Sequence, residues 1–162
     1  MTTPNPTQII AEPGKQEVTI IREFDAPREL VFQAHNDAKL LAQWLGPKDL
    51  TIVFDKFNHV SGGSYRYKAI RNGKEIAGFN GAIHEVCAPE RIIQTFEFEG
   101  IPDRGHVSLD TTLFEELPNH RTRVTIHSVF RSVSDRDAMM ASGMELGVNE
   151  GYEKLDTILK NI

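Results

Sequence analysis

Apolar and polar residues alternate along several short runs in the first four fifths of the chain, which is the pattern of half-buried strands. Val18 and Ile20 mark the first run, in residues 17–24. Asn72-Gly73 is a strong hairpin signal between two of the later runs. Because the connections are short, we expect the strands to pair antiparallel. The later strands are predicted over residues 50–57, 65–69, 75–86, 91–98, 106–115 and 121–130.

Helical spacing replaces alternation in two places. Two short amphipathic stretches follow the first strand; the first begins near Pro27, and the second carries the only tryptophan, Trp44, and ends at Gly46-Pro47. Toward the other end of the chain, apolar residues recur every three or four positions and predict a long helix over residues 143–160.

This order of elements predicts an α+β fold in which a curved antiparallel sheet wraps around a long C-terminal helix, with two short helices after the first strand. We expect one domain over residues 17–162. Residues 1–16 hold Pro4, Pro6 and Pro13 and are interpreted as a flexible lead-in. A sheet crossed by one long helix tends to leave a hollow, so small-molecule binding is the leading functional hypothesis.

Composition narrows the class of protein. Among the 162 residues, 18 lysines and arginines stand against 23 acidic residues, and this net charge of −5 argues against nucleic acid as a partner. The single cysteine, Cys87, rules out an internal disulfide and is typical of a reducing compartment, so we expect a cytoplasmic protein. No apolar stretch reaches the roughly 20 residues that span a bilayer, and no membrane insertion is expected.

Large inward-facing side chains are the candidates for lining the hollow. Tyrosine hydroxyls need partners when they are buried, and a ligand is one such partner. Methionines adapt to irregular surfaces. Core packing is the competing interpretation for each residue. Gly147 and Gly151 on the long helix either let it approach the sheet or leave room for a guest. The predicted ligand-binding residues are Phe32, Trp44, Phe54, Tyr65, Tyr67, Phe79, Phe96, Phe98, Met140, Met144, Val148 and Tyr152.

Signals for chemistry are weaker. The six histidines lack the spacing of metal ligands, so no metal site is predicted, and no phosphate loop, dinucleotide motif or nucleophile elbow points to a cofactor. The catalytic residues of any reaction stay unknown. His84 and Glu85 are the candidates for an acid or base, of which one can face inward. Asp110 and other strand carboxylates are interpreted as solvated. We expect a binding protein rather than an enzyme.

An ordered set of short motifs over about residues 17–160 resembles the START/Bet v 1-like (SRPBCC) helix-grip superfamily, in the branch of the C-terminal domain of the activator of the Hsp90 ATPase, the Aha1 type. Each motif alone is short, and together they are specific for the fold. The motifs are Phe24-Asp25-Ala26-Pro27 with Val31-Phe32, Trp44-Leu45-Gly46-Pro47, Gly62-Gly63-Ser64-Tyr65-Arg66-Tyr67, Gly73-Lys74-Glu75, Gly81, Glu85-Val86-x-x-Pro89-Glu90-Arg91-Ile92, and Gly151-Tyr152 with Leu155.

The resemblance implies a hydrophobic cavity between sheet and helix and a small apolar molecule as partner, with no catalytic residues to carry over. Two alternatives follow from it: a cyclase- or dehydratase-type enzyme acting on an apolar substrate, and a module that contacts an Hsp90-type chaperone. The chain departs from the family in having Phe96 where a tryptophan is frequent. It also has no room for the activator's N-terminal domain, which counts against chaperone contact. A homodimer is left open.

Overall fold

The computed structural model describes residues 5–162. Eight strands and four helices follow one another along these residues. They are β1 (Thr7–Ile10), β2 (Glu17–Phe24), α1 (Arg28–Asn36), α2 (Ala38–Trp44), β3 (Thr51–Asn58), β4 (Ser64–Arg71), β5 (Lys74–Cys87), β6 (Arg91–Phe98), β7 (Val107–Leu117), β8 (Arg121–Val129), α3 (Val133–Ala141) and α4 (Met144–Lys160).

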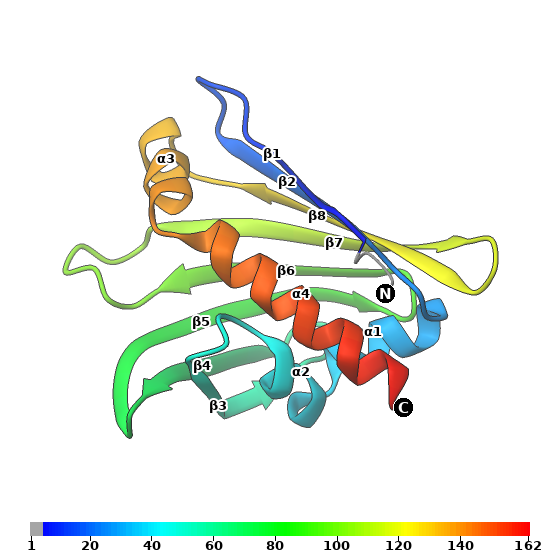
Figure 1. The fold of residues 1–162 in the computed structure, drawn as a ribbon. Coiled ribbons are helices and arrows are strands. Elements are labelled where there is room, and N and C mark those ends of the chain that lie inside the picture. The colour runs from blue at the N-terminus through cyan, green and yellow to red at the C-terminus, as the bar shows by residue number, and fades with distance from the viewer. Residues whose placement is uncertain (1–4) are drawn as a thin grey trace.

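All eight strands form one antiparallel sheet, in the order β1-β2-β8-β7-β6-β5-β4-β3. The sheet curves around α4, which crosses its inner face diagonally (Figure 1). The predicted α+β helix-grip architecture is therefore confirmed. The first strand, the two short helices, the six later strands and the long helix all lie where the hydrophobic pattern places them.

The N-terminal segment differs from the expectation of a flexible lead-in. Thr7–Ile10 form β1, which pairs with β2 at the edge of the sheet, with Ile9 opposite Ile20. Four residues are too few for alternation to be recognised between prolines. Pairing with a partner strand that is already fixed in the sheet stabilises so short a segment. Residues 1–4 of the expected lead-in lie outside the described part of the chain.

Side chains cap the starts of two of the four helices. The Asp37 side chain accepts a hydrogen bond from the Leu40 backbone at 3.0 Å and caps α2, and Ser132 caps α3 through Asp135 at the same distance. α1 and α2 lie against the second half of α4, and α3 lies at its other end (Figure 1). Within residues 5–162, none of these helices is both long and apolar enough to cross a bilayer.

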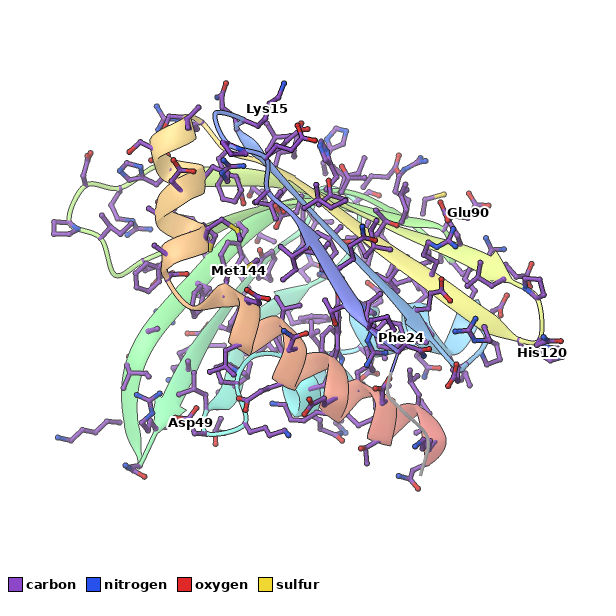
Figure 2. All side chains as sticks on the ribbon, turned by 45° about the horizontal axis from the view of Figure 1, so that its top comes forward. Lys15, Phe24, Asp49, Glu90, His120 and Met144 are labelled. Carbon is purple, nitrogen blue, oxygen red and sulfur yellow. The ribbon has the colours of Figure 1, made fainter. Side chains whose placement is uncertain are left out.

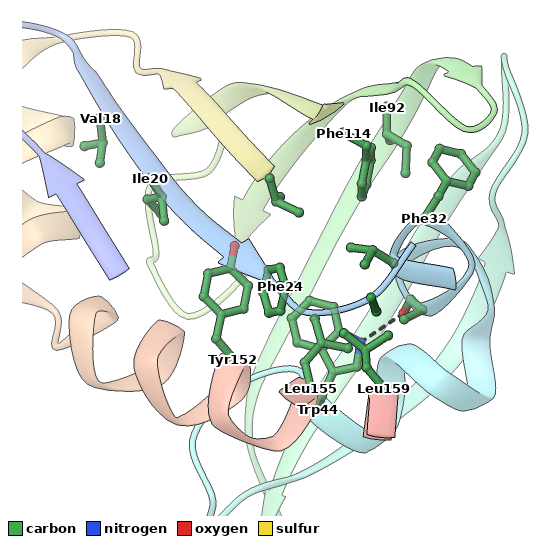
Figure 3. Close-up of a cluster of buried hydrophobic side chains, with 14 of the residues drawn as sticks. Val18, Ile20, Phe24, Phe32, Trp44, Ile92, Phe114, Tyr152, Leu155 and Leu159 are labelled. Atoms are coloured by element: carbon green, nitrogen blue, oxygen red, sulfur yellow. Dashed lines mark hydrogen bonds between the residues drawn. The ribbon is translucent and has the colours of Figure 1, made fainter. Parts of the chain in front are cut away.

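The main hydrophobic core gathers where the second half of α4 meets α1, α2 and the sheet (Figure 3). The Phe24 and Tyr152 rings meet edge to face with their centroids 5.1 Å apart. The Trp44 indole donates a hydrogen bond to the Ala34 carbonyl at 2.9 Å, so its polar atom is satisfied inside the core. We call this region the closed half; it comprises Phe24, Phe32, Trp44, Phe114, Tyr152, Leu155 and Leu159, all at most 8% exposed.

Two buried arginines attach the C-terminal helices to the first long strand. Arg22 of β2 is 2% exposed and makes a two-pronged ion pair with Asp156 of α4, with nitrogen–oxygen distances of 2.5 and 2.9 Å. Arg136 of α3 is equally buried and donates to the carbonyls of Glu12 and Glu17. Guanidinium groups suit such sites because several donors hold a fixed fork geometry.

Candidate functional site

The twelve predicted ligand-binding residues separate into groups. Phe32, Trp44 and Tyr152 belong to the closed half, where neighbouring side chains pack them on all sides. Met140, Met144 and Val148 are half-buried at the edge of that core. The other six line up on the inner face of β3 to β6. They are Phe54, Tyr65, Tyr67, Phe79, Phe96 and Phe98.

Four rings form a continuous row across β3, β4, β5 and β6. The centroid distances are 5.2 Å from Phe54 to Tyr67, 4.9 Å from Tyr67 to Phe79 and 5.4 Å from Phe79 to Phe96. Phe98 flanks the row, 5.5 Å from Phe79. We call Phe54, Tyr67, Phe79 and Phe96 the aromatic row. Its phenylalanines are only half-buried although they face inward, so solvent reaches this part of the interior.

Strand β7 has its apolar side outside. Leu109 is 47% exposed and Leu113 36% exposed, whereas Ser108 is 4% exposed. Alternation then directs Asp110 and Thr112 to the inner face together with buried Phe114. Core-facing strands normally show the opposite polarity. The strand is held in this register by Phe114, which packs against Phe32 in the closed half. The inner face beside the aromatic row therefore carries polar groups.

Asp110 is the main functional candidate that the sequence analysis missed, because its carboxylate was interpreted as solvated. The Ser108 hydroxyl donates to its Oδ1 at 3.0 Å. Burial raises the pKa of the Asp110 carboxyl, and hydrogen bonds from Ser128 and Ser108 oppose that increase. Burial also raises the pKa of Tyr67, and the charge of Asp110 raises it further. A carboxyl group therefore lies among rings inside the sheet.

A second group of polar side chains, joined by hydrogen bonds, lies beside Asp110. The imidazole of His59 lies between two side-chain amides: its Nδ1 is 2.5 Å from the amide of Asn36 and its Nε2 is 3.0 Å from the amide of Gln94. Gln94 is the strand partner of Asp110, so this group of side chains ends next to the carboxyl group. Burial lowers the pKa of His59, which keeps the ring neutral. A neutral ring donates from one nitrogen only, so one of the two amides presents its NH₂ group to the other nitrogen.

The start of α4 forms the boundary, on the helix side, of the region that contains the aromatic row and Asp110. Met144 marks that start in Figure 2, far along the helix from Phe24, which lies beside its second half. A side chain at Gly151 would place its Cβ 2.8 Å from the Trp44 carbonyl, and one at Gly147 would lie 3.5 Å from Pro47. Gly151 therefore serves the close approach of α4 to α2, whereas the distance at Gly147 is an ordinary van der Waals contact that does not require glycine.

We call the region between these boundaries the open half. Its inner-face side chains are all half-buried, unlike those of the closed half. It comprises Phe79, Gln94, Phe96, Phe98, Asp110, Ser128, Met140, Met144 and Val148.

The inverted strand also leaves a shallow groove on the outer face of the sheet. Leu109 and Val129, which are strand partners, are 47% and 39% exposed and form its apolar part. The groove has a volume of about 310 Å³, and Arg131 lies at its end. Ser108, which donates a hydrogen bond to Asp110, is among the residues that line it.

The two residues considered for acid–base chemistry do not lie in the open half. His84 is exposed, and Glu85 forms an ion pair with Arg91 at 2.5 Å. The hydrogen bond to Arg91 lowers the pKa of Glu85. The outward ion pair leaves Glu85 unsuited to meet a guest inside. Within residues 5–162, no group of three metal-ligating side chains comes together.

Comparison with known proteins identifies the family. The profile of the family described as Activator of Hsp90 ATPase homolog 1-like protein matches residues 25–160, and the chain belongs to this family. No curated protein shows significant sequence similarity to the chain.

Solved structures share the fold over nearly the whole chain. A protein from Arthrobacter aurescens is 27% identical with a TM-score of 0.85, covering 96% of this chain and 92% of its own. A protein from Rhodobacter sphaeroides is 24% identical with the same TM-score, covering 97% and 100%. An HSP90 activator from Plasmodium falciparum is more distant, at 18% identity and a TM-score of 0.53 over 70% and 72% of the two chains.

Proposed function

We propose that the protein binds a small, largely apolar or aromatic molecule in the open half, between the aromatic row and the start of α4. The observation that carries this proposal is the inverted polarity of β7. A strand that served packing alone would turn Leu109 and Leu113 inward, yet Ser108 and Asp110 occupy the inner face. Local rules are broken at functional sites more often than elsewhere.

The composition of the open half supports the same proposal. Ligand sites combine apolar and aromatic walls with a few polar groups that orient the guest. Here the walls are the half-buried rings of Phe79 and Phe96 and the side chains of Met144 and Val148. Asp110 and Gln94 are the orienting groups. Membership of the family adds the helix-grip architecture, which by itself does not define a ligand.

The test uses a neutral apolar fluorophore, N-phenyl-1-naphthylamine, whose emission rises when it leaves water. Val148→Trp places a large side chain in the open half, because Val148 is half-buried on the sheet side of α4. Leu146→Trp is the matched control on the same helix, where Leu146 is 61% exposed. We expect the wild type and Leu146→Trp to bind the fluorophore and Val148→Trp to lose most of the signal.

Native mass spectrometry of protein purified from its own host complements this test and identifies the class of any retained molecule. The proposal is wrong if the wild type neither binds the fluorophore nor retains a guest. It is equally wrong if Val148→Trp, shown by circular dichroism to be folded, binds the fluorophore as well as the wild type does.

A further inference from the structure

We propose that the natural guest of the open half is an organic cation, an amine or quaternary ammonium group on an apolar or aromatic body, whose charge is held by Asp110 beside the aromatic row. The inference rests on the proposed binding function and adds the chemical class of the guest. Three features of the structure support it.

The first feature is the set of partners around the carboxyl group. Ser108 donates its hydroxyl to Asp110 Oδ1 at 3.0 Å, and Ser128 of β8 is the strand partner of Asp110. Hydrogen bonds donated to a carboxyl group favour its ionised form. Burial has the larger and opposite effect and raises the pKa of the Asp110 carboxyl group, so a cation beside Asp110 would favour the ionised form that burial disfavours.

The second feature is the missing positive charge. Several half-buried carboxylates have cationic partners, as Asp156 has Arg22 and Glu99 has Arg66. No ion pair in the described chain, residues 5–162, includes Asp110. A carboxylate removed from water without a counter-charge is costly. A cationic guest would offset that cost, whereas an anionic guest would increase it.

The third feature is the position of the aromatic row. The stacked rings end at Phe96 on β6, and the neighbouring strand β7 places Ser108 opposite Phe96 and Asp110 two residues further on. The last ring of the stack therefore lies next to the carboxyl group. Ring faces attract cations, and the attraction grows as the pair is removed from water. Rings and carboxylate together favour an alkylammonium group over a metal ion, since no group of three metal-ligating side chains comes together within the described residues.

The test compares two ligands of the same shape by isothermal titration calorimetry at neutral pH: 1-naphthylmethylamine, which is a cation, and 1-naphthalenemethanol, which is neutral. We expect the wild type to bind the amine at least about tenfold more tightly. Asp110→Asn should abolish this preference and leave the affinity for the alcohol within about twofold. Glu115→Gln is the control, since it removes a 49% exposed carboxylate from the outer face of the same strand. It should change neither affinity.

The outcomes separate the two proposals. Equal affinity of the wild type for amine and alcohol would overturn the cation inference and support the binding function. Equal weakening of both ligands by Asp110→Asn would also overturn it. If neither ligand binds, both proposals fail for guests of this size. The wild-type comparison decides the charge preference even if Asp110→Asn does not fold.

Discussion

The two halves of α4 cover the same sheet in different ways. In the second half, Tyr152, Leu155 and Leu159 are at most 8% exposed and pack into the closed half. In the first half, Met144 and Val148 remain half-buried above an inner face that carries Asp110. A single helix thus supplies a core element at one end and one wall of a candidate site at the other.

The contrast indicates where stability and binding reside. The closed half holds the largest buried side chains and the Arg22–Asp156 ion pair, so the fold depends chiefly on this end. The open half is then free to carry groups that a core would exclude, such as the Asp110 carboxyl. If this division is correct, substitutions in the closed half change unfolding, and those in the open half change binding.

The largest effect is expected at Leu155, which has no exposed surface. Leu155→Ala should lower the free energy of unfolding by about 4 kcal/mol, because the closed half is too tightly packed to fill the resulting cavity. Leu146→Ala on the same helix, where the side chain is 61% exposed, should stay within about 0.5 kcal/mol of the wild type. Urea denaturation measures both. A small loss at Leu155 would remove the distinction between the two halves.

The ion pair at the closed half should give the next largest effect. Asp156→Ala leaves the Arg22 guanidinium buried without its carboxylate and should lower the free energy of unfolding by about 3 kcal/mol. This value is near the low end for buried ion pairs, because Asp156 is a quarter exposed. Asp137→Ala is the control. Its partner Arg136 is equally buried but keeps the two carbonyls of Glu12 and Glu17, so the loss should be below about 1 kcal/mol. Equal losses in urea titrations would show that the Arg22 pair has no special role.

The closed half follows closely from the sequence, and the polar groups of the open half do not. Helical spacing in α4 and alternation in β2 place Tyr152, Leu155 and Phe24 on the correct faces, because each follows the ordinary rule of apolar side inward.

Strand β7 breaks that rule. Leu109 and Leu113 alternate with polar residues as in a half-buried strand, but they face outward, and only the pairing with β6 and β8 reveals this. No local signal distinguishes Asp110 from a solvated strand carboxylate. The sequence analysis missed the edge strand β1 for a different reason. Pairing with β2, rather than the pattern of its own four residues, makes this segment a strand.

A pH titration sharpens the comparison through His35, which lies in the closed half between Trp44 and Phe114. Burial lowers the pKa of His35 from 6.5 to about 4. Between these values the unfolded chain binds a proton and the folded protein does not, so the stabilising contribution is complete above pH 6.5 and is lost as pH falls. From pH 7 to pH 5 the loss should be about 2 kcal/mol, since each pH unit carries at most about 1.4 kcal/mol.

Urea denaturation at the two pH values measures this loss, and variants assign it. His35→Leu should remove most of the dependence, while His84→Leu, at an exposed position, should retain it. Burial lowers the pKa of His59 as well, so His59 contributes to the pH dependence in the same direction. The informative quantity is therefore the difference between the stability losses of His35→Leu and of the wild type from pH 7 to pH 5. If His35→Leu lost as much stability as the wild type between the two pH values, the acid-sensitive group would lie outside the closed half.

The smallest effect, and the one with the unusual sign, is expected in the open half. Asp110→Asn should raise the free energy of unfolding at pH 7 by about 1 kcal/mol, because it removes a carboxyl group that burial disfavours in its charged form. Glu115→Gln on the outer face should change it by less than about 0.5 kcal/mol. Most substitutions destabilise, so a gain identifies a residue kept for a reason other than folding. A loss of more than about 1 kcal/mol in thermal or urea unfolding would instead make Asp110 a structural group, and the polarity of β7 would then serve the sheet rather than a guest.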